Sequence, residues 1–257
     1  MTVDPSKLDV NTTIPTLIRS LVAALRDGVT TFTTGTLTVK SLTRTRSVLT
    51  SGSGTYTTPA KCLYITVRLV GGGGGGGGGG TSGTAGVSNG VDTTFGTSLL
   101  VGHGGALAPI PFSGGGAGGT ASLGSGPTGV ALTGAAGQGG NVVVLGSADN
   151  SMGGFGAGTP FSGPTPSGVY VSGGANAAAN TGAGGGGGSG GNAANLLYGG
   201  GGGGAGGYVD AWIATPAATY AYVVGAGGTG GASGGGVNAA TGGNGGSGLI
   251  IVDEFYL

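Results

Sequence analysis

Two hydrophobic patterns follow one another in residues 1–50. Over residues 11–27 the apolar side chains recur at helical spacing, and they are Ile14, Leu17, Ile18, Leu21, Val22 and Leu25. This stripe, with Pro15 in its first turn and Gly28 after its end, predicts a short amphipathic helix. From residue 29 the period changes to two in a Thr-rich stretch, which predicts short β-strands. Because a short helix and short strands both need partners, this segment is expected to pack on the rest of the chain or on other copies of it.

Alternating patterns predict β-strands on both sides of a glycine-rich middle region. In residues 62–70 the apolar side chains of Ile65, Val67 and Leu69 alternate with Tyr64, Thr66 and Arg68, as in a half-exposed sheet. Further apolar strand-like runs fill residues 208–257. We expect residues 51–70 and 208–257 to form one scaffold, an antiparallel β-sandwich, so that the fold is mainly β.

Glycine dominates residues 71–207, beginning with an unbroken run over residues 71–80 directly after an apolar strand. It accounts for 71 of the 257 residues of the chain. Such a run usually indicates a flexible linker, but a positive mean hydropathy and a formal net charge of zero do not fit a typical disordered chain. We therefore expect an ordered insertion in which extended glycine helices of the polyproline-II type bond to one another through their backbones.

Charge divides the chain at Arg68, because no Lys or Arg follows it. Nucleic acid is therefore not expected as a partner of the region after it. The first residues lack the basic and apolar regions of a signal peptide, and no stretch of 18 apolar residues occurs. We expect synthesis in a cytoplasm, no secretion signal and no insertion into a membrane.

The residue types that carry chemistry are sparse, and no enzyme is expected. Cys62 and His103 are the only residues of their kinds, which excludes an intrachain disulfide and gives a metal ion no cluster of ligands. Asp253 and Glu254 are neighbours in a strand-like run, so they should point to opposite faces and cannot flank one glycosidic bond. Trp212 is expected in the core rather than as a sugar platform. No cofactor motif is present.

Several sequence blocks, taken in order, carry a resemblance to a known family. They are Thr55-Tyr-Thr-Thr-Pro-Ala, Leu63-Tyr-Ile-Thr-Val-Arg-Leu-Val followed by glycines, Gly-Gly-Tyr208-Val-Asp-Ala-Trp212, Tyr220-Ala-Tyr-Val-Val-Gly-Ala-Gly-Gly and Gly248-Leu-Ile-Ile-Val-Asp-Glu-Phe-Tyr256. Together they resemble the glycine-rich C-terminal domain of bacteriophage tail fibres and tail spikes. The style is similar to the tip adhesins of T-even-like phages, in which polyglycine-II helices pack as a lattice.

The resemblance implies a virion protein, a homotrimer, that attaches the phage to its host. Residues 1–50 would bind a phage tail or baseplate protein and form a short Thr-rich β shaft, and residues 51–257 would form the glycine-rich β domain. The receptor would be a surface polysaccharide or an outer-membrane or pilus protein. A structural fibre, baseplate or capsid component without receptor contact is the main alternative. A glycine-rich ice-binding or surface-coating protein is a further one.

Aromatic residues within the glycine-rich loops are the candidates for receptor contact, because a glycine scaffold can bury few of them. Together with the single histidine, the candidate residues are His103, Phe112, Phe155, Phe161, Tyr170 and Tyr198. The same phenylalanines could equally fill the lattice between glycine helices.

Overall fold

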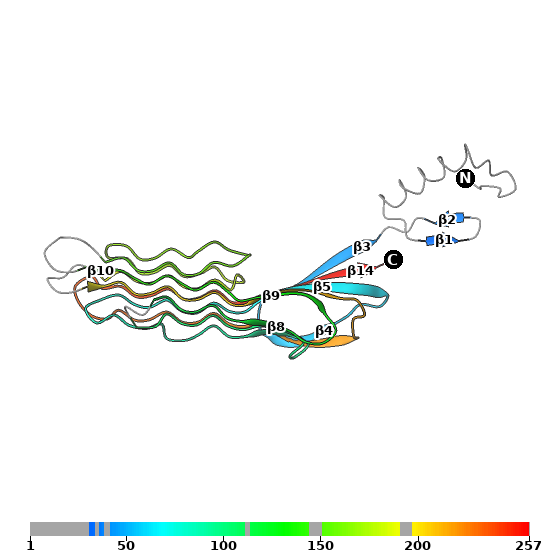
Figure 1. Ribbon diagram of the computed structural model, residues 1–257, viewed down its shortest axis with the longest axis horizontal. Coiled ribbons are helices and arrows are strands. Elements are labelled where there is room, and N and C mark those ends of the chain that lie inside the picture. The colour runs from blue at the N-terminus through cyan, green and yellow to red at the C-terminus, as the bar shows by residue number, and fades with distance from the viewer. Residues whose placement is uncertain are drawn as a thin grey trace, which may run out of the picture.

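The computed structural model describes residues 31–33, 36–38, 42–110, 114–143, 151–190 and 197–256. Within these ranges the chain is mainly β and contains no helix, which confirms the predicted fold class at that level. The helix predicted over residues 11–27 lies outside the described residues. The described chain is elongated, with sheets at one end and a bundle of long, gently waving segments extending from them (Figure 1).

Two five-stranded antiparallel sheets form the sheet end. The first sheet has, in spatial order, β3 (Thr43–Leu49), β14 (Leu249–Tyr256), β5 (Cys62–Val70), β12 (Tyr208–Ile213) and β9 (Thr128–Leu132). The second has β4 (Ser53–Thr57), β13 (Thr219–Val223), β6 (Thr93–Phe95), β7 (Leu100–Gly102) and β8 (Ala121–Leu123). Two short antiparallel pairs stand apart from them, β1 (Thr31–Thr33) with β2 (Thr36–Thr38) and β10 (Val142–Val143) with β11 (Leu197–Tyr198).

Side chains from both sheets share one apolar core. Ile65, Val67 and Leu69 of β5 are fully buried, as their alternation predicts. They belong to the same cluster as Phe95 of β6 and Tyr220 of β13, whose rings stack with centroids 4.6 Å apart. Burying side chains of this size contributes about 1.5–3 kcal/mol each, so this core is the main source of stability at the sheet end.

The glycine run over residues 71–80 lies at the centre of the bundle and is buried along its whole length. Its amide groups donate with a period of three residues. One set donates to residues 198–207, the next set to residues 240–246, and a third, Gly72 and Gly75, to the carbonyls of Val91 and Ser88. A three-residue period without internal hydrogen bonds is the geometry of an extended, three-fold helix.

The carbonyl groups of the same run accept hydrogen bonds from further segments, residues 105–108, 185–188 and 228–234. Gly74, for example, donates to the carbonyl of Gly204 at 2.8 Å and accepts from the amide of Gly185 at 2.9 Å. The central segment is therefore surrounded by neighbours that satisfy its buried backbone groups, as buried amides require.

Close approach explains why glycine fills the centre of the bundle. A Cβ atom placed on Gly74 would lie 1.9 Å from the carbonyl oxygen of Ala106, and one on Gly75 would lie 1.9 Å from that of Thr229. At Gly163, by contrast, a Cβ atom would meet nothing within 4 Å. The neighbours at the centre are backbone atoms that cannot rotate away, so any side chain there would push whole segments apart.

The expected arrangement of the glycine-rich region needs correction. Residues 71–207 are not a single insertion, because β6, β7, β8 and β9 lie inside this range and belong to the two sheets. Conversely, residues 225–248, which follow it, also run through the bundle. The chain passes repeatedly between sheets and bundle, so strands and glycine segments alternate. Residues 43–49, which the sequence analysis placed in the N-terminal segment, form edge strand β3 and pair with β14.

Candidate functional site

The bundle end farthest from the sheets carries turns, which we call the distal end (Figure 1). Its described turns are residues 81–83, 169–172 and 235–239, and the pair β10–β11 lies beside them. Backbone contacts fix this placement, since Gly80 pairs with Tyr198 and the amide of Ser189 donates to the carbonyl of Ser172 at 3.2 Å. The turns therefore sit on the ends of hydrogen-bonded segments rather than on a free loop.

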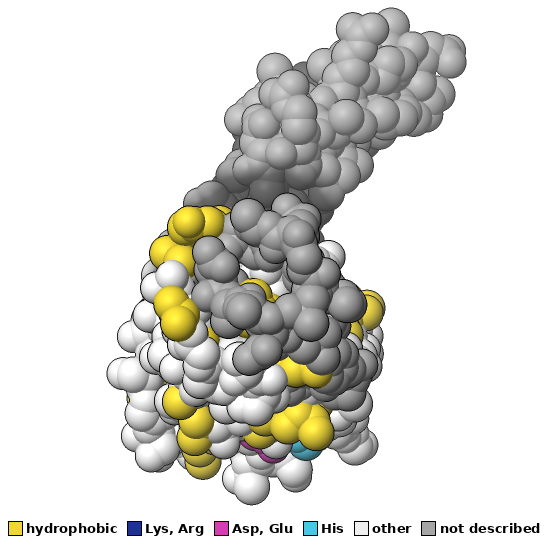
Figure 2. All heavy atoms as spheres, turned by 90° about the vertical axis from the view of Figure 1, so that its left-hand side faces the viewer, with side chains coloured by type: hydrophobic (Ala, Val, Ile, Leu, Met, Phe, Trp, Pro, Cys, Tyr) yellow, Lys and Arg dark blue, Asp and Glu magenta, His cyan; other side chains and the backbone are white. Residues whose placement is uncertain are grey.

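Apolar side chains project from these turns. Val169, Tyr170, Val171 and Val237 are between 44% and 64% exposed. The turn that holds Tyr170 is closed by Ser172, whose hydroxyl donates to the carbonyl of Val169 at 2.7 Å and accepts from its amide at 2.9 Å. Figure 2 views this end and shows scattered hydrophobic side chains, with no Lys or Arg among its described atoms. Exposed apolar side chains on a fixed backbone can bind a complementary surface.

The six candidate receptor residues do not gather in one place. Tyr170 and Tyr198 lie at the distal end, and Phe112 falls outside the described residues. Phe155 is 41% exposed on a bundle segment. Phe161 packs edge-on against Tyr208 of β12, with ring centroids 5.8 Å apart, and so lies at the sheet end.

His103 follows β7 and also lies at the sheet end of the bundle. Its Nδ1 is 2.9 Å from Oδ2 of Asp92, and the other carboxylate oxygen accepts the amide of Gly104 at 2.9 Å. Both side chains are about half exposed. Asp92 thus holds the loop after β7 in place, and the histidine is separated from the distal turns by the length of the bundle.

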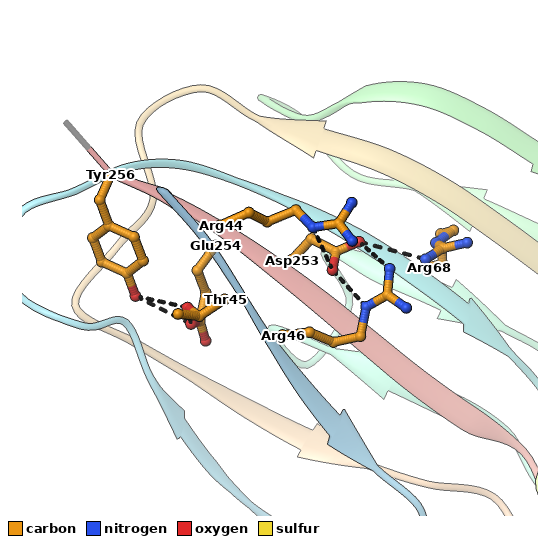
Figure 3. Close-up of polar contacts among 7 residues, drawn as sticks. All are labelled: Arg44, Thr45, Arg46, Arg68, Asp253, Glu254 and Tyr256. Atoms are coloured by element: carbon orange, nitrogen blue, oxygen red, sulfur yellow. Dashed lines mark hydrogen bonds and ion pairs between the residues drawn. The ribbon is translucent and has the colours of Figure 1, made fainter. Parts of the chain in front are cut away.

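The carboxylates of Asp253 and Glu254 point to opposite faces of β14, as predicted (Figure 3). Asp253 accepts from Nε of Arg46 at 2.6 Å and lies 3.4 Å from Nη2 of Arg68. The guanidinium of Arg44 is 3.9 Å away. The hydrogen bond from Arg46 is the main reason that the pKa of Asp253 is lowered. These ion pairs connect β14 to its two neighbours in the sheet, β3 and β5.

Glu254 faces the core side and joins the two sheets. It accepts the hydroxyl of Tyr56, from β4, at 2.8 Å and that of Ser47 at 2.9 Å, with further bonds from Thr45 and Tyr256. Burial acts to raise the pKa of Glu254, but these hydrogen bonds together outweigh it, so the pKa is lowered. The Tyr56 pKa is raised, first by burial and then by its bond to Glu254. The carboxylate is therefore a structural acceptor, because its partners come from β3, β4 and its own strand.

The prediction that Trp212 belongs to the core is wrong. It is 46% exposed on the outer side of the first sheet, because the core positions of β12 are Val209, Ala211 and Ile213. Its ring meets Tyr64 edge-on at 5.9 Å, and Tyr64 in turn stacks on Phe255 at 4.5 Å. The strict alternation of residues 208–213 indicates this position, because it places Trp212 on the face opposite to Val209, Ala211 and Ile213.

Other kinds of site are not found in the part of the chain that the structure describes. No group of three or more His, Cys, Asp or Glu is placed to hold a metal ion there. No helix in those ranges has the length and apolar character needed to cross a bilayer. Cys62 is half-buried, with its sulfur 3.3 Å from the carbonyl oxygen of Tyr64. Comparison with protein-family models and with curated proteins gives no match.

Proposed function

We propose that this chain is a receptor-binding protein of a bacteriophage tail fibre, which attaches the virion to the host cell surface without catalysis. The observation that carries the proposal is the backbone-bonded bundle, which holds a set of exposed turns at one end. We infer that the bundle is a lattice of the polyglycine-II type, since its bonds repeat every third residue between segments that run both ways.

The polarity of the molecule supports this function. The chain leading from residues 1–42 enters at β3, in the sheet end, whereas the turns lie at the opposite end (Figure 1). An adhesin needs this separation of attachment from recognition. In the proposed assembly, the segment that precedes β3 binds a tail or baseplate protein, the protein is a homotrimer, and the distal turns face the host.

The energetics of binding also favour rigid turns. Association loses about 0.5–1.5 kcal/mol for each flexible side chain that becomes ordered, so a preformed surface binds more tightly. Tyr170 is a suitable anchor because tyrosine offers a large contact area with few rotatable bonds. The described distal residues carry no cation, so the receptor contact would be apolar and hydrogen-bonded, to a protein loop or a neutral polysaccharide.

Competition for host cells tests the proposal. The purified protein should block adsorption of the phage that encodes it, and a variant with Tyr170→Asn and Val237→Ser should lose this effect at least tenfold. Asn suits position 170 because the backbone φ is +60° there, a conformation that Asn tolerates.

A control variant separates the distal end from general surface effects. Val87→Ser removes a side chain that is 66% exposed on a bundle segment away from the distal turns, and it should compete as well as wild type. If the wild-type protein neither binds susceptible cells nor blocks adsorption, the proposal is wrong. Loss of particle assembly rather than adsorption would instead favour a structural fibre.

A further inference from the structure

Strand β3 forms one edge of the first sheet. It pairs with β14 on one side, and in the part of the chain that the structure describes no strand pairs with its other side. Among the four edge strands of the two large sheets β3 is the longest, with seven residues against five in β4 and β9 and three in β8. An edge strand presents backbone N–H and C=O groups that have no partner within its own sheet. A further extended segment can therefore add to β3.

The side chains of β3 divide between two faces, since residues two apart in a strand point the same way. Thr45 and Ser47 point to the core side, where both hydroxyl groups donate to a carboxylate of β14. Arg44, Arg46 and Val48 point to the outer face, the side of the sheet turned away from the shared core, and are 42–55% exposed. The core side thus holds the strand in place, while the alternation Arg-x-Arg-x-Val is presented outward along the edge.

Positive charge exceeds negative charge beside this edge. The guanidinium groups of Arg44, Arg46 and Arg68 gather around one buried carboxylate, that of Asp253 (Figure 3). Arg46 bonds to it through Nε at 2.6 Å and Nη2 at 3.1 Å, whereas Nε of Arg44 lies 3.9 Å away, beyond hydrogen-bond reach. Asp210 stands opposite Arg68 in the register and offsets its charge, so the surplus belongs to Arg44 and Arg46. Their remaining N–H groups suit a further carboxylate.

The edge and the arginine row together define what would fit. In an added strand, the outward side chains would stand opposite Arg44, Arg46 and Val48, with Cβ atoms about 5 Å apart. Opposite charges facing each other across strands are favourable, and like charges are unfavourable. The matching segment therefore has two acidic residues spaced two apart and an apolar residue two further along. A polysaccharide offers carboxylates but not the backbone that pairs with a strand edge, so a polypeptide fits both features.

This chain does not itself supply such a segment. Its eight acidic residues include no two that are spaced two apart. A second copy of β3 does not fit either, because pairing edge to edge would bring the arginines of both copies together, and charged edge strands oppose that pairing. We propose that β3 binds an extended acidic segment of another protein, which adds to the sheet as a sixth strand. The inference goes beyond the proposed function, because it concerns neither the distal turns nor the segment that precedes β3.

A peptide of matched register tests the proposal on the full-length protein. Fluorescein-labelled Thr-Val-Thr-Glu-Thr-Glu-Thr, paired antiparallel with β3, places its glutamates opposite Arg46 and Arg44. The isomer Thr-Val-Thr-Thr-Glu-Glu-Thr has the same composition and charge, but its two glutamates point to opposite faces. Fluorescence polarisation should show the matched peptide binding about fivefold more tightly, for the one arginine contact that the isomer loses. Hydrogen exchange at the amides of β3 should slow on binding, because an added strand supplies acceptors.

Charge reversal identifies the contact. Arg44→Glu changes an arginine that makes no hydrogen bond to Asp253, and it should weaken binding of the matched peptide about tenfold. Replacing the last glutamate of the peptide by lysine should restore binding to this variant, which also shows that the variant is folded. Lys61→Glu is the matched control, since it makes the same change of charge on the exposed turn before β5 and should bind as wild type does.

Three results would overturn the proposal. They are no binding of the matched peptide to the wild-type protein, equal binding of the two isomers, and binding that leaves exchange at β3 unchanged. Polygalacturonate, an acidic polysaccharide, is titrated separately. If it binds in a manner that Arg44→Glu abolishes while the matched peptide does not bind, the arginines hold an acidic sugar chain and the proposal of strand addition is wrong.

Discussion

The sheet end and the glycine bundle achieve buried order in opposite ways. In the sheets, side chains such as Ile250, Leu69 and Phe95 fill the space between two layers, and the backbone bonds lie within each layer. In the bundle, backbone fills most of the space between segments, and most buried amides bond to a neighbouring segment. A core made of side chains is weakened when atoms are removed, whereas a core made of backbone is weakened when atoms are added.

The bundle depends on the sheets for its alignment. Ordering a residue costs about 1–2 kcal/mol of backbone entropy, while an intramolecular hydrogen bond returns about 1 kcal/mol net, so a glycine lattice alone is close to neutral. Its segments, however, continue directly from strands: residues 71–80 follow β5, and residues 198–207 lead into β12. The apolar core fixes these strands in register and thereby sets the spacing of the glycine segments.

The largest expected effect concerns amide exchange in the bundle. If residues 72–79 are as ordered as β5, their amides should exchange more slowly than in a free peptide by a factor of about a thousand or more. Hydrogen exchange followed by mass spectrometry measures this, with peptides from β5 as the internal reference. Exchange at the free-peptide rate would show that the run is a tether and would end the comparison between two kinds of core.

Adding one methyl group at the centre of the bundle should be strongly destabilising. Gly74→Ala would place its Cβ against the carbonyl of Ala106, and we expect a loss of about 3 kcal/mol or more, at the upper end of the overpacking range. Gly163→Ala is the control, because it adds the same atom to open space and should change stability by less than about 0.5 kcal/mol. Denaturant unfolding monitored by circular dichroism compares them. Equal stability of the two variants would contradict close backbone packing.

The sequence predicted the parts of the fold in which side chains alternate. The pattern of β5 gave its buried face correctly, and the opposite directions of Asp253 and Glu254 followed from strand geometry alone. The alternation of strands and glycine segments was missed, because a stretch as short as Thr93–Phe95 carries too little pattern to distinguish a strand from lattice filler. The candidate receptor residues were dispersed for a similar reason, since sequence position does not reveal which end of the bundle a glycine loop occupies.

The ion pairs at β14 should make stability depend on acid pH. The pKa values of Asp253 and Glu254 are both lowered on folding, so their contribution is complete above the unfolded values of about 3.9 and 4.3. It is lost as the pH falls through the lowered folded values. Asp253→Asn should cost about 1–2 kcal/mol at pH 7, discounted because its arginines are half exposed, and should flatten the acid slope. Thermal unfolding between pH 2 and 7 measures both, and an unchanged slope would contradict the assignment.

Removing one methylene from the sheet core is the counterpart of adding one to the bundle. Ile250→Val shortens a fully buried side chain between the sheets and should destabilise by about 0.5–1.5 kcal/mol, clearly less than Gly74→Ala. The difference follows because side chains around a small cavity can relax, whereas bonded backbone segments cannot separate without losing several hydrogen bonds together. A larger loss for Ile250→Val than for Gly74→Ala, measured by the same denaturant titration, would reverse the comparison.

The smallest loss of stability is expected where a pair of half-exposed side chains lies on the surface of the backbone-bonded region. His103→Ala removes the contact with Asp92, but the Asp92 carboxylate keeps the amide of Gly104, and the loop backbone keeps its own bonds. Because both side chains are about half exposed, we expect a loss below about 1 kcal/mol in thermal unfolding. Asp92→Ala should cost more, since it leaves the Gly104 amide without its acceptor. If the histidine variant were the more damaging, side chains and not backbone would order this end of the bundle.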